Sequence, residues 1–311
     1  MTYNSKIFLD GGDPAETREI LALLGSLEGQ TTNPTLIAKN PYAKARFEKG
    51  EKFTKQEILD FYKSVVTNIS SLIPNGSVSI EVYADKNTTA EEMLKQAREM
   101  WKWIPNAHIK FPTTHVGLAS AEQLISEGGR VNMTLVFSQE QAAAVHSATR
   151  GAKKGDVFVS PFVGRLDDIG QNGMDLIKNI KQMYNEAESH VEILSASIRS
   201  NEHFLASLAY KADIITAPAK AIYEWVSSLP LPLFKGEVPS PRGEGVSPEW
   251  IQGWLSDSKN FEGFQYDAKA LKPIPYKQLD LSKNWRDFDI AHPLTDKGVE
   301  RFANDWNALI K

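Results

Sequence analysis

Short apolar runs alternate with longer segments of helical periodicity along most of the chain, and this alternation constrains the fold more than any other feature. Each of eight runs rich in β-branched and apolar residues is followed by a segment with helical periodicity. A strand, a helix and another strand in succession are typical of a parallel sheet. The predicted strands are Lys6–Asp10, Gly29–Thr32, Val78–Val82, His108–Phe111, Val131–Val136, Val157–Ser160, Val191–Ser195 and Asp213–Thr216.

Eight strand–helix units in about 225 residues are the number expected for an α/β fold of the (β/α)8 type, the TIM barrel. A doubly wound sheet is the alternative, because one misassigned strand would convert either fold into the other. Two helix starts carry cap signals, namely Asp13 before Pro14 and a capping box at Ser138–Gln141. The predicted helices are Pro14–Leu24, Lys55–Leu72, Thr89–Trp103, Val116–Glu127, Gln139–Ala148, Gly173–Ala187, Asn201–Ala209 and Ala219–Ser227.

The chain changes character after the eighth unit. We expect one domain over residues 1–311, with the barrel at about 5–228 and a C-terminal extension at 229–311. Proline and glycine recur in Leu229–Pro248, which predicts a loop. A short helix at Pro248–Leu255 and an irregular stretch to about Ile290 follow, and Thr295–Ile310 is predicted as a final amphipathic helix.

Composition excludes several functional classes. The net charge of −4 provides no basic field for nucleic acid or anionic lipid. The absence of cysteine excludes disulfides and thiolate metal sites, and it fits an intracellular protein. We find no signal peptide and no apolar stretch near the roughly 18–20 residues that span a bilayer. We therefore expect a cytoplasmic protein without a metal site, for which a homo-oligomer is compatible with the sequence.

Lys110 stands out inside the predicted strand His108–Phe111. Side chains alternate across a strand, so Ile109 and Phe111 share one face and Lys110 takes the other. An ammonium group in a packed interior is unfavourable unless it loses its proton or finds a partner. Lys110 is therefore a candidate amine nucleophile for a carbonyl substrate. The alternative is a lysine at a strand end whose charged head reaches water.

Polar residues near the C-terminal ends of other predicted strands share this placement. Asp10 and Glu81 face away from the apolar side of their strands, and in the seventh strand we assign Ser195 to the same face, followed by Ser197. In a barrel this face leads to the mouth, where active sites are built. Any one such residue alone would be interpreted as a cap or turn residue, but eight favour a shared site: Asp10, Asn33, Glu81, Lys110, Asn132, Thr134, Ser160 and Ser197.

Two arginines follow strands six and seven directly. Arg165 lies in Ser160–Arg165 and Arg199 ends Ser195–Arg199. A guanidinium fork suits a bidentate phosphate contact, and TIM barrels often bind phosphate in their late loops. Salt bridges on the rim of the barrel are the alternative.

Six segments, in this order, resemble the transaldolase family, whose members are class I aldolase-type TIM barrels that work through a Schiff base. The Thr-Thr-Asn-Pro and Ser-Pro-Phe-Val-Gly-Arg segments are the most specific, and the resemblance covers roughly residues 5–225. Leu229–Asp289 does not match a part of the family that we can place. The segments are Leu9–Asp13, Thr31–Ile37, Ile109–Pro112, Asn132–Ser138, Ser160–Arg165 and Ala196–Arg199.

The resemblance implies a function in the pentose phosphate pathway. A dihydroxyacetone unit would pass from sedoheptulose 7-phosphate or fructose 6-phosphate to an aldose phosphate, without metal or other cofactor. Small-molecule sugar phosphates would be the partners. Lys110 would form the Schiff base, Asp10 and Glu81 would transfer protons, and Thr134 would act with a bound water. The implied substrate-binding residues are Thr32, Asn33, Asn132, Ser160, Phe162, Arg165, Ser197 and Arg199.

Two alternatives stay open. The first is a fructose-6-phosphate aldolase of the same family, which would release free dihydroxyacetone. That subgroup resembles the family except for a glutamine at the position of Glu81 and a tyrosine at that of Phe162, which speaks against it here. The second is a barrel that binds sugar phosphate without catalysis. The presence of Asp10, Glu81 and Lys110 together argues against it, because binding alone needs no acid and base around an amine.

Overall fold

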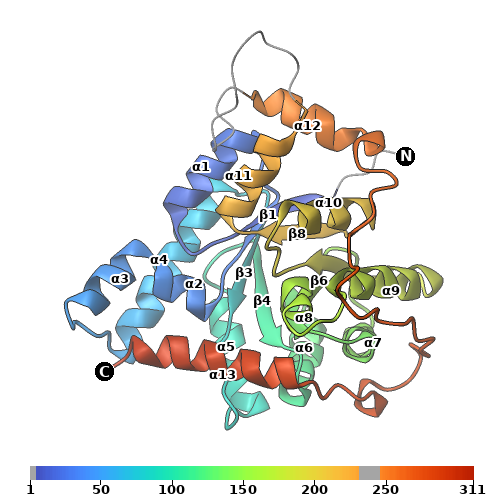
Figure 1. Ribbon diagram of the computed structural model, residues 1–311. Helices are drawn as coiled ribbons and strands as arrows, with labels where there is room; N and C mark the ends of the chain where they lie inside the picture. Colours follow the sequence, from blue (N-terminus) through green and yellow to red (C-terminus); the bar gives the residue numbers. More distant parts are fainter. Residues whose placement is uncertain (1–4, 231–245) are drawn as a thin grey trace.

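The strands form a closed parallel barrel in a computed structural model that describes residues 5–230 and 246–311. They follow one another in chain order, and the first pairs with the last (Figure 1). This closure confirms the (β/α)8 barrel and excludes the doubly wound sheet, which would leave two open edges. The strands are β1 (Lys6–Asp10), β2 (Gly29–Thr31), β3 (Ser77–Glu81), β4 (Ala107–Pro112), β5 (Val131–Val136), β6 (Val157–Pro161), β7 (Glu192–Ser195) and β8 (Ile214–Ala217).

The eight predicted barrel helices are all present, and their ends differ from the prediction by a few residues at most. Both cap signals are confirmed: the Asp13 carboxylate accepts the Ala15 N–H at 2.9 Å, and Ser138 and Gln141 form a capping box. These helices are α1 (Pro14–Leu24), α4 (Lys55–Leu72), α5 (Ala90–Met100), α6 (His115–Ser126), α7 (Gln139–Ala148), α9 (Gly173–Glu186), α10 (Asn201–Ala209) and α11 (Ala219–Ser228).

Three further helices in the described residues were not predicted. Two of them carry residues of the cavity at the mouth of the barrel, and the third follows directly after one of these. They are α2 (Pro34–Lys39), α3 (Pro41–Glu48) and α8 (Val163–Asp167), with 6, 8 and 5 residues. A helix of one or two turns is too short for its periodicity to be recognised. Asparagine caps followed by proline begin α2 and α3.

The C-terminal extension runs back over the barrel and ends in a helix, as expected. The helices α12 (Pro248–Ser256) and α13 (Pro293–Ala308) correspond to the two predicted ones. Of the loop predicted at Leu229–Pro248, residues 231–245 lie outside the described residues. No helix in the described part of the chain is long and apolar enough to cross a bilayer.

Residues 257–292, which we call the strap, join α12 to α13 along the outside of the barrel helices. Barrel side chains bind the strap backbone: the Asn179 amide donates to the Ile274 carbonyl at 2.8 Å, and the Gln139 amide donates to the Pro275 carbonyl at 2.9 Å. The strap delivers α13 to the mouth of the barrel, where α13 contacts α2 and the end of β5 (Figure 1).

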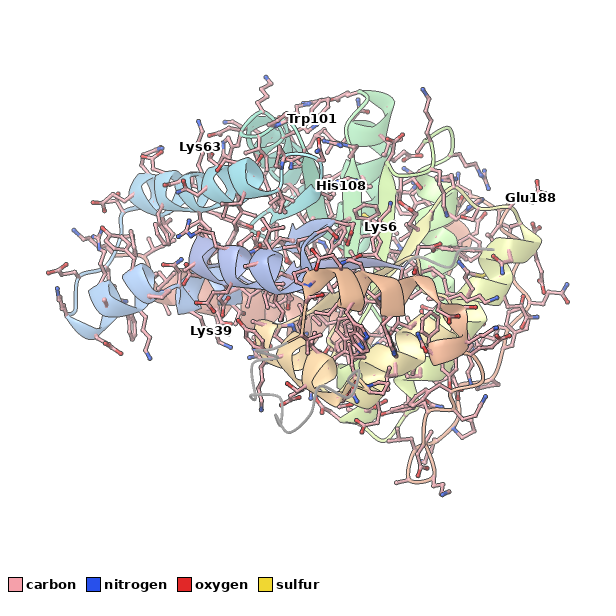
Figure 2. The ribbon with its side chains drawn as sticks, turned by 90° about the horizontal axis from the view of Figure 1, so that it is seen from above. Lys6, Lys39, Lys63, Trp101, His108 and Glu188 are labelled. Atoms are coloured by element: carbon pink, nitrogen blue, oxygen red, sulfur yellow. The ribbon has the colours of Figure 1, made fainter. Side chains whose placement is uncertain are left out.

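An aromatic layer fills the barrel interior below the mouth. Figure 2 labels His108, one of its three members. The Phe8 ring meets the Phe158 ring edge to face at a centroid distance of 6.0 Å, and the His108 ring stacks on Phe158 at 4.1 Å. Gly29 makes room for Phe8, because a Cβ at position 29 would lie 2.4 Å from that ring. Any cavity above this layer therefore opens only toward the mouth.

One prediction about the interior is wrong. Ser195 does not face inward: its hydroxyl lies 2.8 Å from the Ser207 hydroxyl on α10. The inward positions of β7 include Leu194, which lines the cavity at the mouth. Ser197 still reaches that cavity because its φ of 60° ends the extended alternation of the strand.

Acid should unfold the protein partly through His108. Burial lowers the pKa of this imidazole to about 3. The unfolded chain therefore takes up a proton near pH 6.5 that the folded chain refuses, so stability is lost as the pH falls below about 6.5. We expect the unfolding free energy, measured by urea unfolding, to fall between pH 7.5 and pH 5. The fall in the parent protein should exceed the fall in His108→Gln by about 1–2 kcal/mol. Parallel pH profiles of the two proteins would contradict this assignment.

Candidate active site

A cavity of about 180 Å³ opens at the C-terminal ends of the strands, a size suited to a small metabolite. Eight of the predicted site residues line it: Asp10, Asn33, Lys110, Ser160, Phe162, Arg165, Ser197 and Arg199. The other four, Thr32, Glu81, Asn132 and Thr134, are buried among the same strand ends but do not line the cavity.

Lys110 reaches the cavity from β4 and is only 3% exposed. Its Nζ lies 3.2 Å from Glu81 Oε2 and donates to the Thr32 carbonyl at 3.2 Å. The pairing of β3 with β4 sets Glu81 directly beside Lys110. The amine therefore lies next to a carboxyl group that can exchange a proton with it.

Glu81 and Thr134 hold polar atoms that lack hydrogen bonds of good geometry within the described residues. These atoms are Glu81 Oε2, which has the Lys110 ammonium at 3.2 Å, and the Thr134 hydroxyl. Burial raises the pKa of Glu81, although the Lys110 charge opposes the shift. Buried polar atoms are rarely left unpaired, so this pair of atoms is suited to a water molecule or a polar substrate group.

Asp10 lies at the end of β1 and lines the same cavity. Its Oδ1 accepts the Thr31 hydroxyl at 2.7 Å, and that hydroxyl lies 2.6 Å from the Thr216 hydroxyl. Burial raises the pKa of Asp10 against the opposing effect of Lys110. Asp10 and Glu81 can therefore each hold a proton at a higher pH than an exposed carboxyl group does.

A chain of amide and hydroxyl groups extends across the strands near Lys110. The Ser160 hydroxyl donates to Asn132 Oδ1 at 2.6 Å, and Asn132 Nδ2 donates to the Ser79 hydroxyl at 3.0 Å. Asn33 combines two roles, because it lines the cavity while its Oδ1 caps α2 by accepting the Leu36 N–H at 2.9 Å.

The Thr32 side chain does not line the cavity, whereas that of its neighbour Asn33 does. The Thr32 hydroxyl turns away from the cavity, lying 2.6 Å from the Tyr62 hydroxyl and donating to the Ser79 carbonyl at 2.7 Å. Tyr62 in turn accepts the Glu81 N–H at 2.9 Å. Thr32 thus presents only its backbone carbonyl to Lys110, while its side chain holds β2 against β3 and α4.

The two predicted arginines lie together at the mouth. Arg165, on α8, has its guanidinium 4.9 Å from the Phe162 ring centroid and 5.5 Å from that of Phe302. Arg199 forms an ion pair with Asp168, in which both side chains are about half exposed. Aromatic faces on two sides fix the Arg165 fork in a preferred direction.

Sequence reasoning missed the contribution of α2 and α13 to the cavity. Lys39 comes from α2, and Arg301 and Phe302 come from α13. Arg301 has the i,i+4 pattern with Asp305 that predicts a solvated helix face, and nothing local places it beside Arg165. With these residues the mouth carries four cations (Lys39, Arg165, Arg199 and Arg301), an arrangement suited to an anionic ligand.

The chain matches the family model described as "Transaldolase/Fructose-6-phosphate aldolase" over residues 7–311. A protein of Dehalococcoides mccartyi named "Probable transaldolase" is 42% identical over 219 residues, which cover 70% of this chain and 89% of that protein. Proteins of the same name from Lactiplantibacillus plantarum and Alkaliphilus metalliredigens are 37% and 32% identical, each over 98% of this chain, and the alignments cover 97% and 100% of those proteins. The family model and the two longer alignments also run through residues 229–289, the segment that the resemblance alone did not place.

Gly298 should be essential for the seating of α13 on the barrel. A Cβ at position 298 would lie 2.5 Å from the Leu135 side chain and 2.9 Å from the Arg165 guanidinium. Leu135 is fully buried and has a φ of 60°, so it has little freedom to yield. Gly298→Val should lower the unfolding free energy by about 1–3 kcal/mol through overpacking.

Gly253→Val is the matched control, because a Cβ at this position in α12 meets no atom within 4 Å. It should leave the stability nearly unchanged. Equal stabilities of the two variants in urea unfolding would show that α13 is not seated through Gly298.

Proposed function

The chain belongs to the transaldolase/fructose-6-phosphate aldolase family, and within it we propose that the protein is a transaldolase of the pentose phosphate pathway. It transfers a dihydroxyacetone unit from fructose 6-phosphate or sedoheptulose 7-phosphate to an aldose phosphate. The observation that carries this proposal is the buried Lys110 amine, 3.2 Å from Glu81, in a cavity rimmed by cations. The chemistry requires no metal and no cofactor.

The first step is imine formation at Lys110. The ammonium gives a proton to Glu81, and the neutral amine attacks the C2 carbonyl of the ketose. The carbinolamine then loses water, with Glu81 returning the proton to the leaving hydroxyl. Two buried polar atoms support this assignment, the Thr134 hydroxyl and Glu81 Oε2. A buried water molecule needs such atoms as hydrogen-bond partners.

The second step breaks the C3–C4 bond of the ketose. Asp10 takes the proton of the C4 hydroxyl, C4 becomes the carbonyl carbon of the departing aldose, and the electron pair of the broken bond forms the enamine with the iminium nitrogen. The acceptor aldose then enters, and the same steps run backward to give a new ketose and free Lys110. The raised pKa of Asp10 supports its role, since it must hold this proton until the acceptor arrives.

Binding is divided between the two ends of the substrate. Asn33, Asn132 and Ser160 hold the hydroxyls of the dihydroxyacetone unit near Lys110, supported by the Ser160–Asn132 bond. The phosphate binds to Arg165, Ser197 and Arg199 at the mouth, where Arg301 and Lys39 add positive charge.

Transaldolase rather than aldolase is favoured by Glu81 and Phe162. Phe162 lines the cavity with an apolar ring that packs edge-on against Phe137. The Phe162 ring itself carries no hydroxyl to direct water at the enamine, so the enamine survives until an aldose arrives. The decisive test compares fructose 6-phosphate alone with fructose 6-phosphate plus erythrose 4-phosphate. Turnover only with the acceptor supports a transaldolase, and turnover without it would identify an aldolase.

Lys110→Arg should abolish turnover, because a guanidinium keeps the charge but cannot form the imine. In the parent protein, borohydride with fructose 6-phosphate should reduce the imine and attach the sugar to Lys110, as seen by peptide mass spectrometry. Attachment at another lysine, or substantial activity of the arginine variant, would end the proposal. A protein that binds the sugar phosphate without any trapping would be a non-catalytic binding barrel.

Asp10→Asn and Glu81→Gln should affect different steps. Removing a general acid or base lowers a rate by about 10²–10⁴-fold. Asp10→Asn should still trap fructose 6-phosphate with borohydride but release no aldose, whereas Glu81→Gln should slow the trapping itself. Trapping rates equal to the parent's in both variants would show that this division is wrong.

A further inference from the structure

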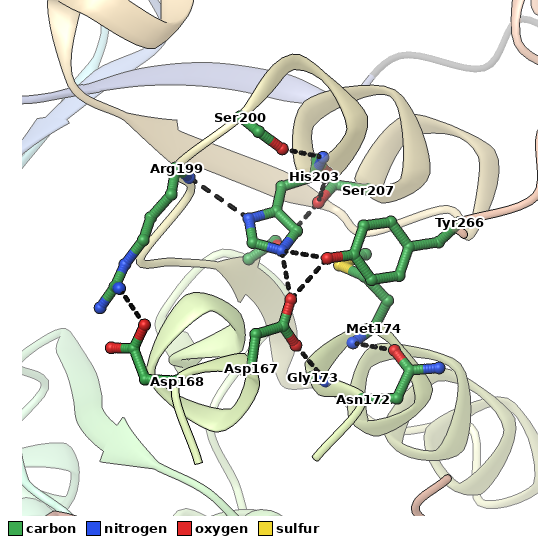
Figure 3. Close-up of polar contacts among 11 residues, drawn as sticks. Asp167, Asp168, Asn172, Gly173, Met174, Arg199, Ser200, His203, Ser207 and Tyr266 are labelled. Atoms are coloured by element: carbon green, nitrogen blue, oxygen red, sulfur yellow. Dashed lines mark hydrogen bonds and ion pairs between the residues drawn. The ribbon is translucent and has the colours of Figure 1, made fainter. Parts of the chain in front are cut away.

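Three side chains beside Arg199 form a hydrogen-bonded triad (Figure 3). Asp167 Oδ2 accepts from His203 Nε2 at 2.8 Å and from the Tyr266 hydroxyl at 2.5 Å. The other carboxylate oxygen accepts the Gly173 N–H at 2.8 Å. Tyr266 lies on the strap, about a hundred residues along the chain from Asp167.

The protonation state of the triad follows from its partners. His203 Nδ1 accepts the Arg199 N–H at 3.3 Å, so the ring proton is assigned to Nε2 and points at Asp167. Burial alone would raise the pKa of Asp167, but hydrogen bonds from His203, Tyr266 and Gly173 outweigh it and lower that pKa. Burial, followed by the hydrogen bond to Asp167 and the charge of that carboxylate, raises the pKa of Tyr266. At neutral pH the triad is therefore a carboxylate that receives two hydrogen bonds at one oxygen.

The triad joins the two segments that carry the phosphate-binding arginines. Asp167 follows Arg165 by two residues on α8, and His203 follows Arg199 by four residues in the first turn of α10. Asp168, the residue after Asp167, forms the ion pair with Arg199 (Figure 3). A shift of His203 relative to Asp167 would therefore change the spacing of the two guanidinium groups.

The two segments are in close contact beside the triad, so the distance between the two guanidinium groups can vary little. The Gly164 N–H donates to the Ser197 carbonyl at 3.2 Å. A Cβ at position 164 would lie 2.4 Å from that carbonyl oxygen and 2.8 Å from Arg199 Nε. Contact between α8 and the Ser197–Arg199 loop thus sets their distance, and the triad sets how α8 is turned against α10.

We propose that Tyr266, Asp167 and His203 are positioning residues that set the spacing of Arg165 and Arg199 and so make the site selective for phosphorylated substrates. The strap is then part of the specificity of the enzyme as well as the tether of α13. This inference rests on the proposed function for its substrates. None of the three side chains lines the cavity, so each acts through the arginines.

The test uses Tyr266→Phe, which keeps the ring and removes one donor to Asp167. Borohydride trapping is measured against the concentration of fructose 6-phosphate and, separately, of dihydroxyacetone, which has no phosphate. The half-saturating concentration of fructose 6-phosphate should rise about three- to tenfold, as expected for losing one hydrogen bond to a charged group. The half-saturating concentration of dihydroxyacetone should not change, and neither should the trapping rate at saturation.

Tyr276→Phe is the matched control, because Tyr276 is another strap tyrosine whose hydroxyl donates to a carboxylate, Glu186, at 2.7 Å on an exposed surface. It should leave both half-saturating concentrations unchanged. His203→Asn should behave like Tyr266→Phe, since its amide can accept from Arg199 but no longer reaches Asp167. Equal losses with both donors, or no loss with either, would overturn the proposal.

A readout without catalysis separates this inference from the proposed function. Inorganic phosphate, titrated calorimetrically into the parent protein, Tyr266→Phe and Tyr276→Phe, reports the phosphate site without the reaction at Lys110. Weaker phosphate binding confined to Tyr266→Phe supports the triad even if no sugar is ever trapped at Lys110. Equal phosphate binding by all three proteins, or none by the parent, would refute it whatever the reaction.

Discussion

The buried pair of Lys110 and Glu81 sets the requirements that the rest of the site meets. Two opposite charges taken out of water cost several kcal/mol each, and a carboxylate at 3.2 Å repays this only in part. A barrel can carry the cost because its outer face buries a continuous apolar layer against the helices. In the proposed reaction the pair is also the starting point, since one proton shift between the partners leaves both neutral and the amine nucleophilic.

The chemistry is confined to one end of the barrel by its packing. Below the pair, Phe8, His108 and Phe158 fill the interior and close it to solvent. Above it, cations from three helices and the loop after β7 surround the opening. In the proposed function this arrangement holds the phosphate at the mouth while the carbonyl end of the substrate enters the less polar interior.

The strands, the barrel and the inward-facing polar groups could be predicted because they depend on local information. Period-two alternation places Asp10, Glu81 and Lys110 on one face without knowledge of the fold. The face of Ser195 in β7 was misassigned although alternation holds there, and at Ser197 the positive φ restores a side chain to the cavity. Arg301 and Phe302 could not be foreseen, because their position depends on the path of the strap around the molecule.

That path means that the mouth depends on contacts between distant parts of the chain. Strap carbonyls accept from Gln139 and Ser147, each 136 residues away in sequence, and Thr295 bonds to Gln141 across 154 residues. Such contacts have partners only after the barrel helices are in place, since loop closure over these lengths is unfavourable until the rest of the surface exists. The strands can therefore assemble the Lys110–Glu81 pair before the strap delivers Arg301 and the Tyr266 hydroxyl. The proposed phosphate site is in this sense added to a barrel that already holds the amine and its carboxylate.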